Sequence, residues 1–155
     1  MRSRVVVRES VLPARADDVW ARATTIEGID HELRPWLSMS VPRGAEGLDL
    51  ASVTPPHHVG RSWIRLLGVL PVDADDVTVA EVGPGLRFLE RSRMLSAPLW
   101  QHERTVEPLG ERMCRVRDRL TFTPRPGLGP VAERVVGALF THRHRRLRAA
   151  WPART

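Results

Sequence analysis

The amino-acid sequence predicts an α+β fold in which a curved antiparallel sheet packs against a long C-terminal helix. Three features predict it: strand-like segments separated by turn residues from about 37 to 123, an apolar helical stripe from about 131 to 150, and two short helical patterns after the first strand. Consecutive strands with short turns favour an antiparallel meander. The open side of such a sheet needs a covering layer, which the long helix provides.

The first three elements occupy the N-terminal part of the chain. RVVVRESVLP is rich in β-branched residues and is typical of a strand, which Pro13 ends. In ARADDVWARATT, Asp17 and Asp18 favour the first turn of a helix. IEGIDHELRPWL has apolar residues at helical spacing until Pro35 stops the pattern. The sequence therefore predicts one strand followed by two short helices.

The middle of the chain contains the remaining strands. A looser connection is expected between PRGAEG and TPPHHVG. SWIRLLGVL and DVTVAEV then flank PVDAD, which is predicted to be a turn because proline and aspartate favour turns. The next strands are LRFLERSRML, LWQHERTVE and RMCRVRDRLTFT, separated by SAP and PLGE.

The C-terminal segment is expected to form the covering helix. Val136, Phe140, Leu147 and Trp151 share one helical face, whereas most arginines of this segment lie elsewhere. The basic cluster THRHRRLRAAWPART also suggests nucleic-acid binding. Because no recognised DNA- or RNA-binding motif accompanies the charge, a nucleic-acid-binding module is the least favoured interpretation.

Composition limits the class of protein. At 155 residues the chain is most simply one domain, residues 1–155. Cys114 is the only cysteine, which excludes an intrachain disulfide and suits a reducing compartment. All 24 basic residues are arginine, so chemistry that needs a Schiff-base or P-loop lysine is excluded. No apolar run approaches the roughly 18 residues that span a bilayer. We expect a soluble, cytoplasmic protein.

The element order resembles a known superfamily. The entry into the first helix, PA followed by DDVW, the strand pattern W-x-H-x-R-x-V and the terminal LFTHRHRRLRAAW resemble START-like proteins of the SRPBCC superfamily. The resemblance implies a helix-grip fold, with about seven antiparallel strands wrapped around the long helix and a cavity for an apolar or amphipathic small molecule. Such proteins include lipid carriers, hormone receptors and polyketide cyclases, so the resemblance implies a pocket more strongly than a reaction.

One strand has an unusual inward face. In LWQHERTVEP, the alternation places Trp100, His102, Arg104 and Val106 on the same side, so two cationic groups lie in the middle of an apolar face. Burying such groups without partners is costly. Their neighbours on the adjacent strands therefore decide whether this face belongs to a core or to a site.

The following strand offers a carboxylate. A connection centred near Gly110 would pair Val106 with Cys114 and place His102 opposite Asp118. Asp118 is the only charge on the apolar side of its strand.

The preceding strand offers a second carboxylate. A turn around Ala97 would pair Met94 with Trp100 and Glu90 with Arg104. Each cation would then have an acidic neighbour. Two interpretations stay open: a neutralised structural layer, or a polar band that orients a ligand.

We expect the protein to bind an apolar or aromatic, lipid- or polyketide-like molecule between the sheet and the C-terminal helix, as a carrier or sensor. The alternative is a polyketide cyclase, aromatase or dehydratase in which His102, polarised by Asp118, is the general base and Arg104 stabilises an enolate. The chain shows no cofactor motif and no histidine pair at metal-ligand spacing, so neither a cofactor nor a metal is expected. The expected ligand contacts are Trp36, Ile64, Leu66, Phe88, Glu90, Met94, Trp100, His102, Arg104, Asp118, Leu120, Phe140 and His144.

Overall fold

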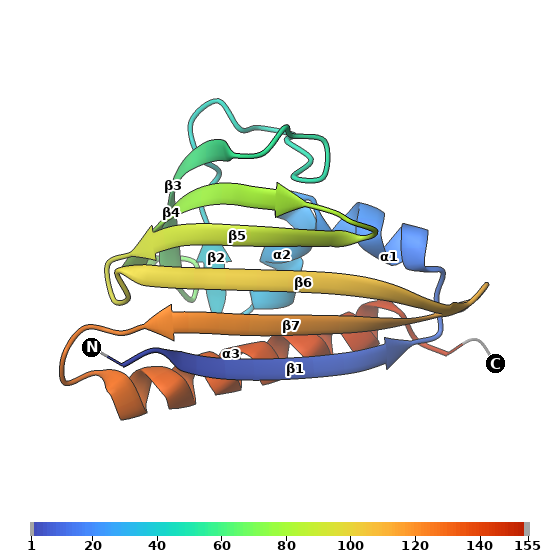
Figure 1. Ribbon diagram of the computed structural model, residues 1–155. Helices are drawn as coiled ribbons and strands as arrows, with labels where there is room; N and C mark the ends of the chain where they lie inside the picture. Colours follow the sequence, from blue (N-terminus) through green and yellow to red (C-terminus); the bar gives the residue numbers. More distant parts are fainter. Residues whose placement is uncertain (1, 154–155) are drawn as a thin grey trace.

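The computed structural model describes residues 2–153 and shows a seven-stranded antiparallel sheet that curls against one long helix (Figure 1). The strand order is β1-β7-β6-β5-β4-β3-β2. The predicted helix-grip fold class is confirmed. The strands are β1 (Arg4–Leu12), β2 (Leu37–Met39), β3 (His57–Leu66), β4 (Leu70–Val82), β5 (Arg87–Met94), β6 (Leu99–Gly110) and β7 (Met113–Thr123), and the helices are α1 (Ala16–Ala23), α2 (Ile26–Leu33) and α3 (Gly129–Ala150).

The two short helices follow β1 as the sequence predicts. Val19 and Ala23 of α1 are buried, and the side chain of Thr25 caps α2 by accepting a hydrogen bond from the Gly28 backbone N–H at 3.0 Å. Gly28 also lies against the end of α1, where a Cβ would be only 1.9 Å from the carbonyl oxygen of Arg22. The close approach of the two helices therefore requires glycine at this position.

Two apolar clusters fill the space between the sheet and α3. One lies at the end of the sheet near α1, and the other lies near the start of α3. Between them, four elements have polar residues at buried positions: Ser10 on β1, Arg104 on β6, Asp118 on β7 and His144 on α3. We call the buried residues Ser10, Glu32, His102, Arg104, Asp118, Arg143 and His144 the polar layer.

The β3–β4 hairpin differs from the prediction. Its connection is Leu67–Val69, in which Leu67 and Gly68 have left-handed backbone angles (φ 53° and 77°). PVDAD is therefore not a turn, and β4 runs through it as one long strand. Asp73 instead accepts hydrogen bonds from the loop that follows β5, including the Leu95 N–H at 3.0 Å. Its carboxylate organises a turn made by another part of the chain.

The β6–β7 register is shifted by two residues from the predicted pairing. β6 continues to Gly110, so Val106 lies opposite Val116 and Arg104 lies opposite Asp118. Because side chains alternate between the two faces of a strand, a shift of two residues leaves the same side chains on the inner face of the sheet. Only their partners on the neighbouring strand change.

A shift of the same size occurs between β5 and β6. Glu90 lies opposite His102, and Arg104 lies opposite Phe88. The turn is centred one residue earlier than expected, and the Met94 N–H donates to the Ala97 carbonyl at 3.0 Å. The predicted Arg104–Glu90 pair is therefore wrong.

The long helix carries charge on several faces. Its buried residues include Phe140 and Leu147, but also Arg143 and His144. Within residues 2–153, none of the helices combines the length and apolar character needed to cross a membrane.

Candidate functional site

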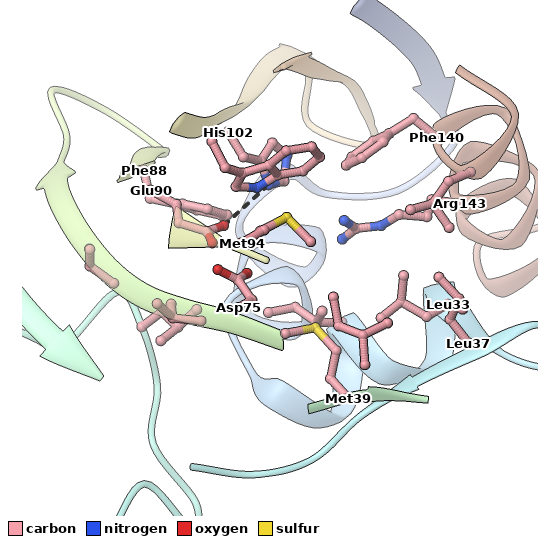
Figure 2. Close-up of a pocket in the computed structure, with 17 residues that line it drawn as sticks. Leu33, Leu37, Met39, Asp75, Phe88, Glu90, Met94, His102, Phe140 and Arg143 are labelled. Carbon is pink, nitrogen blue, oxygen red and sulfur yellow. Dashed lines mark ion pairs between the residues drawn. The ribbon is translucent and has the colours of Figure 1, made fainter. Parts of the chain in front are cut away.

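A pocket of about 100 Å³ lies between α3, α2, β2 and the inner face of the sheet (Figure 2). Most of its wall is aliphatic or aromatic. The apolar lining residues are Ile29, Leu33, Leu37, Met39, Leu50, Ile64, Val77, Val79, Phe88, Met94, Trp100, Leu139 and Phe140. The ionisable ones are Asp75, Glu90, His102 and Arg143. An apolar wall with a few converging polar groups is the usual pattern of a small-molecule site.

Asp75 and Glu90 form an acidic pair at one side of the pocket. Asp75 is 5% exposed, and its Oδ1 receives no hydrogen bond from a donor among residues 2–153. Burial, and then the adjacent charge of Glu90, raise the pKa of Asp75 well above its usual range. Burial also acts to raise the pKa of Glu90, but its interactions with the neighbouring His102 and Asp75 lower it overall. Of the two carboxyl groups, Asp75 is therefore the one that retains a proton more readily.

His102 connects this acidic pair to the polar layer. Its Nδ1 lies 3.8 Å from Oε2 of Glu90, and its Nε2 lies 2.6 Å from Oδ1 of Asp118. Phe88 and Phe140 contact the imidazole in edge-to-face geometry, with ring centroids 5.6 and 5.2 Å away. The ring is held by two aromatic side chains and by the hydrogen bond at Nε2.

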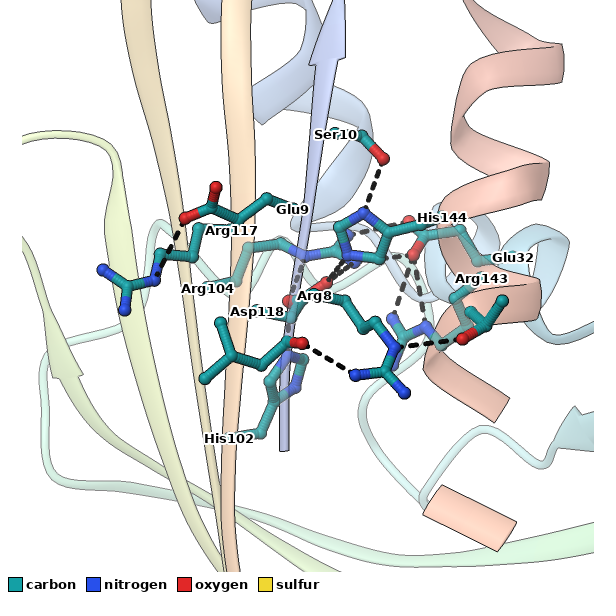
Figure 3. A network of polar contacts seen from close by, with 12 residues as sticks. Arg8, Glu9, Ser10, Glu32, His102, Arg104, Arg117, Asp118, Arg143 and His144 are labelled. Atoms are coloured by element: carbon teal, nitrogen blue, oxygen red, sulfur yellow. Dashed lines mark hydrogen bonds and ion pairs between the residues drawn. The ribbon is translucent and has the colours of Figure 1, made fainter. Parts of the chain in front are cut away.

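Asp118 is the centre of the polar layer (Figure 3). Its Oδ1 accepts from Nε of Arg104 at 2.7 Å, and its Oδ2 accepts from Nη2 of Arg104 and Nε2 of His144, both at 2.7 Å. With His102, four hydrogen bonds occupy this fully buried carboxylate. Burial opposes its ionisation, but the charge of Arg104 and then of His102 hold the pKa of Asp118 well below its usual range. Because the ionised carboxylate only accepts, both imidazoles donate from Nε2.

Arg104 is enclosed by carboxylates on two sides. Besides Asp118, it donates to both oxygens of Glu32 from α2, each at 2.8 Å. Burial acts to lower the pKa of Arg104, but Asp118 and Glu32 raise it well above its usual range. The side chain is fully buried, so its donors are committed to the polar layer and not to the pocket.

Arg143 is the guanidinium that lines the pocket. It donates to Oε1 of Glu32 at 3.2 Å and lies over the ring of Phe140, 4.7 Å from its centroid. Glu32 is fully buried, which opposes its ionisation, but Arg104 and then Arg143 lower its pKa. Glu32 thus holds both arginines in place.

The polar layer continues away from the pocket. Nδ1 of His144 lies 2.7 Å from Oγ of Ser10, which also accepts from Nη1 of Arg148 at 2.9 Å. A continuous series of polar contacts therefore runs from the sheet to α3 and back to β1. Its members, in order, are Glu90, His102, Asp118, His144 and Ser10.

The structure separates the expected ligand contacts into two groups. Arg104, Asp118 and His144 lie behind the pocket wall in the polar layer. Leu120 is fully buried in an apolar cluster, and Leu66 is 39% exposed. The expected residues that line the pocket are Ile64, Phe88, Glu90, Met94, Trp100, His102 and Phe140.

Trp36 lies outside the pocket but close to its rim. Its side chain is 56% exposed and borders a surface groove along α3. Leu37 and Leu139 line both this groove and the pocket, so the two depressions share a wall.

The sequence did not identify Glu32, Asp75 or Arg143 as site residues. The sequence did contain a pattern that places Arg143 on the inward face of the helix, because Arg143 lies three residues after Phe140 and four before Leu147. Asp75 was assigned to a turn, and no local pattern distinguished Glu32 from a solvent-exposed helix residue.

The remaining histidines contact other groups. His58 lies at the start of β3, where a loop was expected, and its Nε2 is 2.6 Å from Oδ1 of Asp76. Nε2 of His142 donates to the carbonyl of Arg34 at 2.9 Å. The described part of the chain contains no group of three His, Cys, Asp or Glu side chains arranged to hold a metal ion.

Comparison with solved structures shows that the chain has the helix-grip fold seen in START-like proteins. A START superfamily protein from Mycobacterium smegmatis is 12% identical, with 95% of this chain and 96% of that chain covered and a TM-score of 0.69. The Zhui aromatase/cyclase from Streptomyces sp. R1128 is 13% identical over 96% of each chain, with a TM-score of 0.64. Norcoclaurine synthase from Thalictrum flavum is 13% identical over 99% of this chain and 90% of that chain, with a TM-score of 0.62. At these identities the likeness shows the fold alone.

The chain belongs to the domain family of unknown function DUF8410, whose model matches residues 10–151. A search of curated proteins finds no match.

Proposed function

We propose that this protein binds a small, largely apolar molecule with one polar end in the pocket between α3 and the sheet, and carries or senses it. The observation that supports this most is the pocket wall, where aliphatic and aromatic side chains surround Asp75, Glu90, His102 and Arg143. A filled core rarely has several ionisable groups facing one cavity, because each is costly to bury without a partner.

The size of the pocket limits the ligand. Its volume of about 100 Å³ is below the roughly 300–1,000 Å³ typical of sites for drug-sized molecules. A single ring with a short polar substituent suits this volume. A longer lipid- or polyketide-like ligand requires displacement of flexible wall residues, for which Met39 and Met94 are suited because methionine adapts its shape readily.

Native mass spectrometry of protein purified from its own host tests binding directly. A retained small molecule of defined mass, lost on denaturation, is the expected result. Protein that carries nothing under native conditions, and whose melting temperature is unchanged by one-ring aromatic probes, would contradict the proposal.

A second candidate is a cyclase, aromatase or dehydratase with His102 as general base. The favouring observation is that Asp118 accepts from Nε2 of His102 while Nδ1 lies on the side of Glu90 and the pocket. A carboxylate that fixes one imidazole nitrogen so that the other can take a proton is a common catalytic arrangement. Arg143 is better placed than Arg104 to stabilise developing negative charge, because it lines the pocket.

His102→Gln separates the two candidates. For an enzyme, this variant retains binding of a polyketide-like substrate and loses turnover. Unchanged turnover would exclude His102 as the base. Absence of turnover in the wild type, with binding intact, favours the carrier or sensor.

The nucleic-acid interpretation loses support from the contacts of α3. Arg143 bonds Glu32, Arg146 donates to the carbonyl of His31 at 3.1 Å, and Arg148 donates to Ser10. A large part of the basic cluster is therefore used within the protein.

A further inference from the structure

The acidic pair in the pocket indicates which polar group the ligand carries, an inference that rests on the proposed function. We propose that the polar end of the ligand is a protonated amine, which binds against the carboxyl groups of Asp75 and Glu90.

The first reason is the distribution of buried charge. Glu32 and Asp118 both bind Arg104, and Glu32 also binds Arg143. Asp75 is also buried and the side chain of Glu90 is only 14% exposed, but neither forms an ion pair with an arginine within residues 2–153. The polar layer is thus balanced by the protein itself, whereas the acidic pair lacks a permanent cation. A ligand cation supplies one.

The second reason is the environment of Asp75. The charges that act on Asp75 are those of Glu90 on β5 and then of Asp73 and Asp76 on its own strand, and its backbone partner on β5 is Met94. On β6, His102 lies beyond Glu90, and on α3 the pocket is lined by Arg143, which Glu32 already binds. The charges that act most strongly on Asp75 are negative. This surrounding favours an approaching cation and disfavours an anion.

The third reason is the number of free acceptors. Oδ1 of Asp75 lacks a donor from the described residues, and Glu90 accepts from Ser92 Oγ at 2.8 Å. A primary ammonium has three donors and no acceptor, so it can satisfy oxygens on both carboxyl groups at once. A hydroxyl group offers one donor and no charge.

Binding then has a proton balance. In the free protein Asp75 retains its proton to a higher pH than an ordinary carboxyl group does, because it is buried and Glu90 places a negative charge in the same pocket. When the ammonium binds, the carboxyl O–H of this pair breaks, and its proton passes to solvent. The product is an ammonium between two carboxylates, and no other bond changes.

The experiment compares probes of one shape and different charge: benzylamine, benzyl alcohol and benzoate. Isothermal titration near neutral pH, in two buffers of different ionisation enthalpy, gives both affinity and proton release. Wild type is expected to bind benzylamine at least about tenfold more tightly than benzyl alcohol, since a charge-assisted hydrogen bond is stronger than a neutral one. Benzylamine should release protons and benzyl alcohol should not.

Asp75→Asn removes the titrating group and keeps its shape. This variant should lose the preference for benzylamine and the proton release, while its affinity for benzyl alcohol is unchanged. Asp18→Asn is the matched control, because it makes the same exchange on α1, where the side chain of Asp18 is 59% exposed and lies 3.9 Å from Arg15. The control should behave as the wild type does.

The possible outcomes are separable. Equal affinity for benzylamine and benzyl alcohol, or amine binding without proton release, overturns the amine inference and leaves the proposed function standing. A preference for benzoate overturns it in favour of recognition by Arg143. Failure of all three probes contradicts both proposals. The wild-type comparison remains decisive even where Asp75→Asn does not fold.

Discussion

The substitution Asp118→Asn tests how strongly the polar layer stabilises the fold. The change keeps the shape of the side chain and removes its charge. Two hydrogen bonds from Arg104 and one each from His102 and His144 currently fill its four acceptor positions. An amide has one oxygen, and its NH₂ group would face donors. The variant therefore leaves buried donors unpaired and removes the charge opposite Arg104.

The magnitude follows from burial. Asp118 and Arg104 are both fully buried, and breaking a buried ion pair by removing one partner costs about 3–5 kcal/mol. Glu32 continues to bind Arg104, which keeps the loss within this range rather than above it. For a domain of this length each kcal/mol corresponds to about 2–4 °C. We expect the melting temperature to fall by roughly 6–20 °C.

The matched control is Glu9→Gln, which makes the same exchange in a surface pair. Glu9 lies 3.5 Å from Arg117, and both side chains are half exposed. Such pairs contribute at most about 1 kcal/mol. Thermal melts and urea midpoints of both variants give the comparison. If Asp118→Asn melts as Glu9→Gln does, the polar layer does not stabilise the fold as argued.

The pH dependence of the stability of wild type and of Asp118→Asn gives an independent check. The pKa of Asp118 is lowered in the folded state, so its contribution is full above the ordinary carboxyl pKa of about 3.9 and is lost as the pH falls below it. Wild type should therefore lose stability in acid more steeply than Asp118→Asn.

Three further predictions concern other parts of the molecule. Asp75→Asn should become more stable relative to wild type as the pH rises from about 4 through the raised pKa of Asp75. Over this range Asp75 of the wild type ionises more readily in the unfolded chain than in the folded one, so the wild type loses stability and the variant does not. A constant difference in melting temperature across that range would contradict this. Gly28→Ala should lower the melting temperature by an amount that corresponds to about 1–3 kcal/mol, since the new Cβ would overlap the Arg22 carbonyl; an unchanged or higher melting temperature would show that α1 and α2 separate easily. Chelation with EDTA should leave binding of a one-ring probe unchanged in titrations, and loss of binding would reveal a metal-dependent site.

The fold was predictable because hydrophobic alternation is a local property of the chain. The inward face of β7 follows from RMCRVRDRLTFT alone, since arginines alternate with apolar residues and Asp118. The register between strands could not be predicted from one strand alone. It depended on where β6 ended, and the strand continued through PLGE to Gly110 before turning. Pairing shifted by two residues while the buried set stayed the same.

The turn between β3 and β4 shows a different limit. Leucine rarely adopts a left-handed backbone, so Leu67 carries no sequence signal for its position in the turn. Pro71 and the aspartates that follow it are typical turn residues, yet they lie within β4. The misplaced turn concealed Asp75, the side chain on which the amine inference depends.

The candidate site also depended on contacts between distant elements. His102 and Asp118 are close in the predicted sheet and are in contact in the structure. Glu32 comes from a helix 72 residues before Arg104 and displaces Glu90 as the partner of that arginine. No strand pattern contains this information, because Glu32 lies on α2 and not on a strand beside β6.

Arg104 is the residue whose role changes most, and Arg104→Met tests the change. From sequence it was expected to hold the polar end of a ligand, and its loss would then weaken binding of a polar probe selectively. In the structure it joins Glu32 to Asp118 behind the pocket wall. Removing it leaves two buried carboxylates without their main cation, and a loss of about 3–5 kcal/mol is expected. Because the guanidinium does not line the pocket, the ratio of affinities for benzylamine and benzyl alcohol should stay at the wild-type value when measured well below the melting temperature. If stability is unchanged and that ratio collapses, Arg104 contacts the ligand, and the division between polar layer and pocket is incorrect.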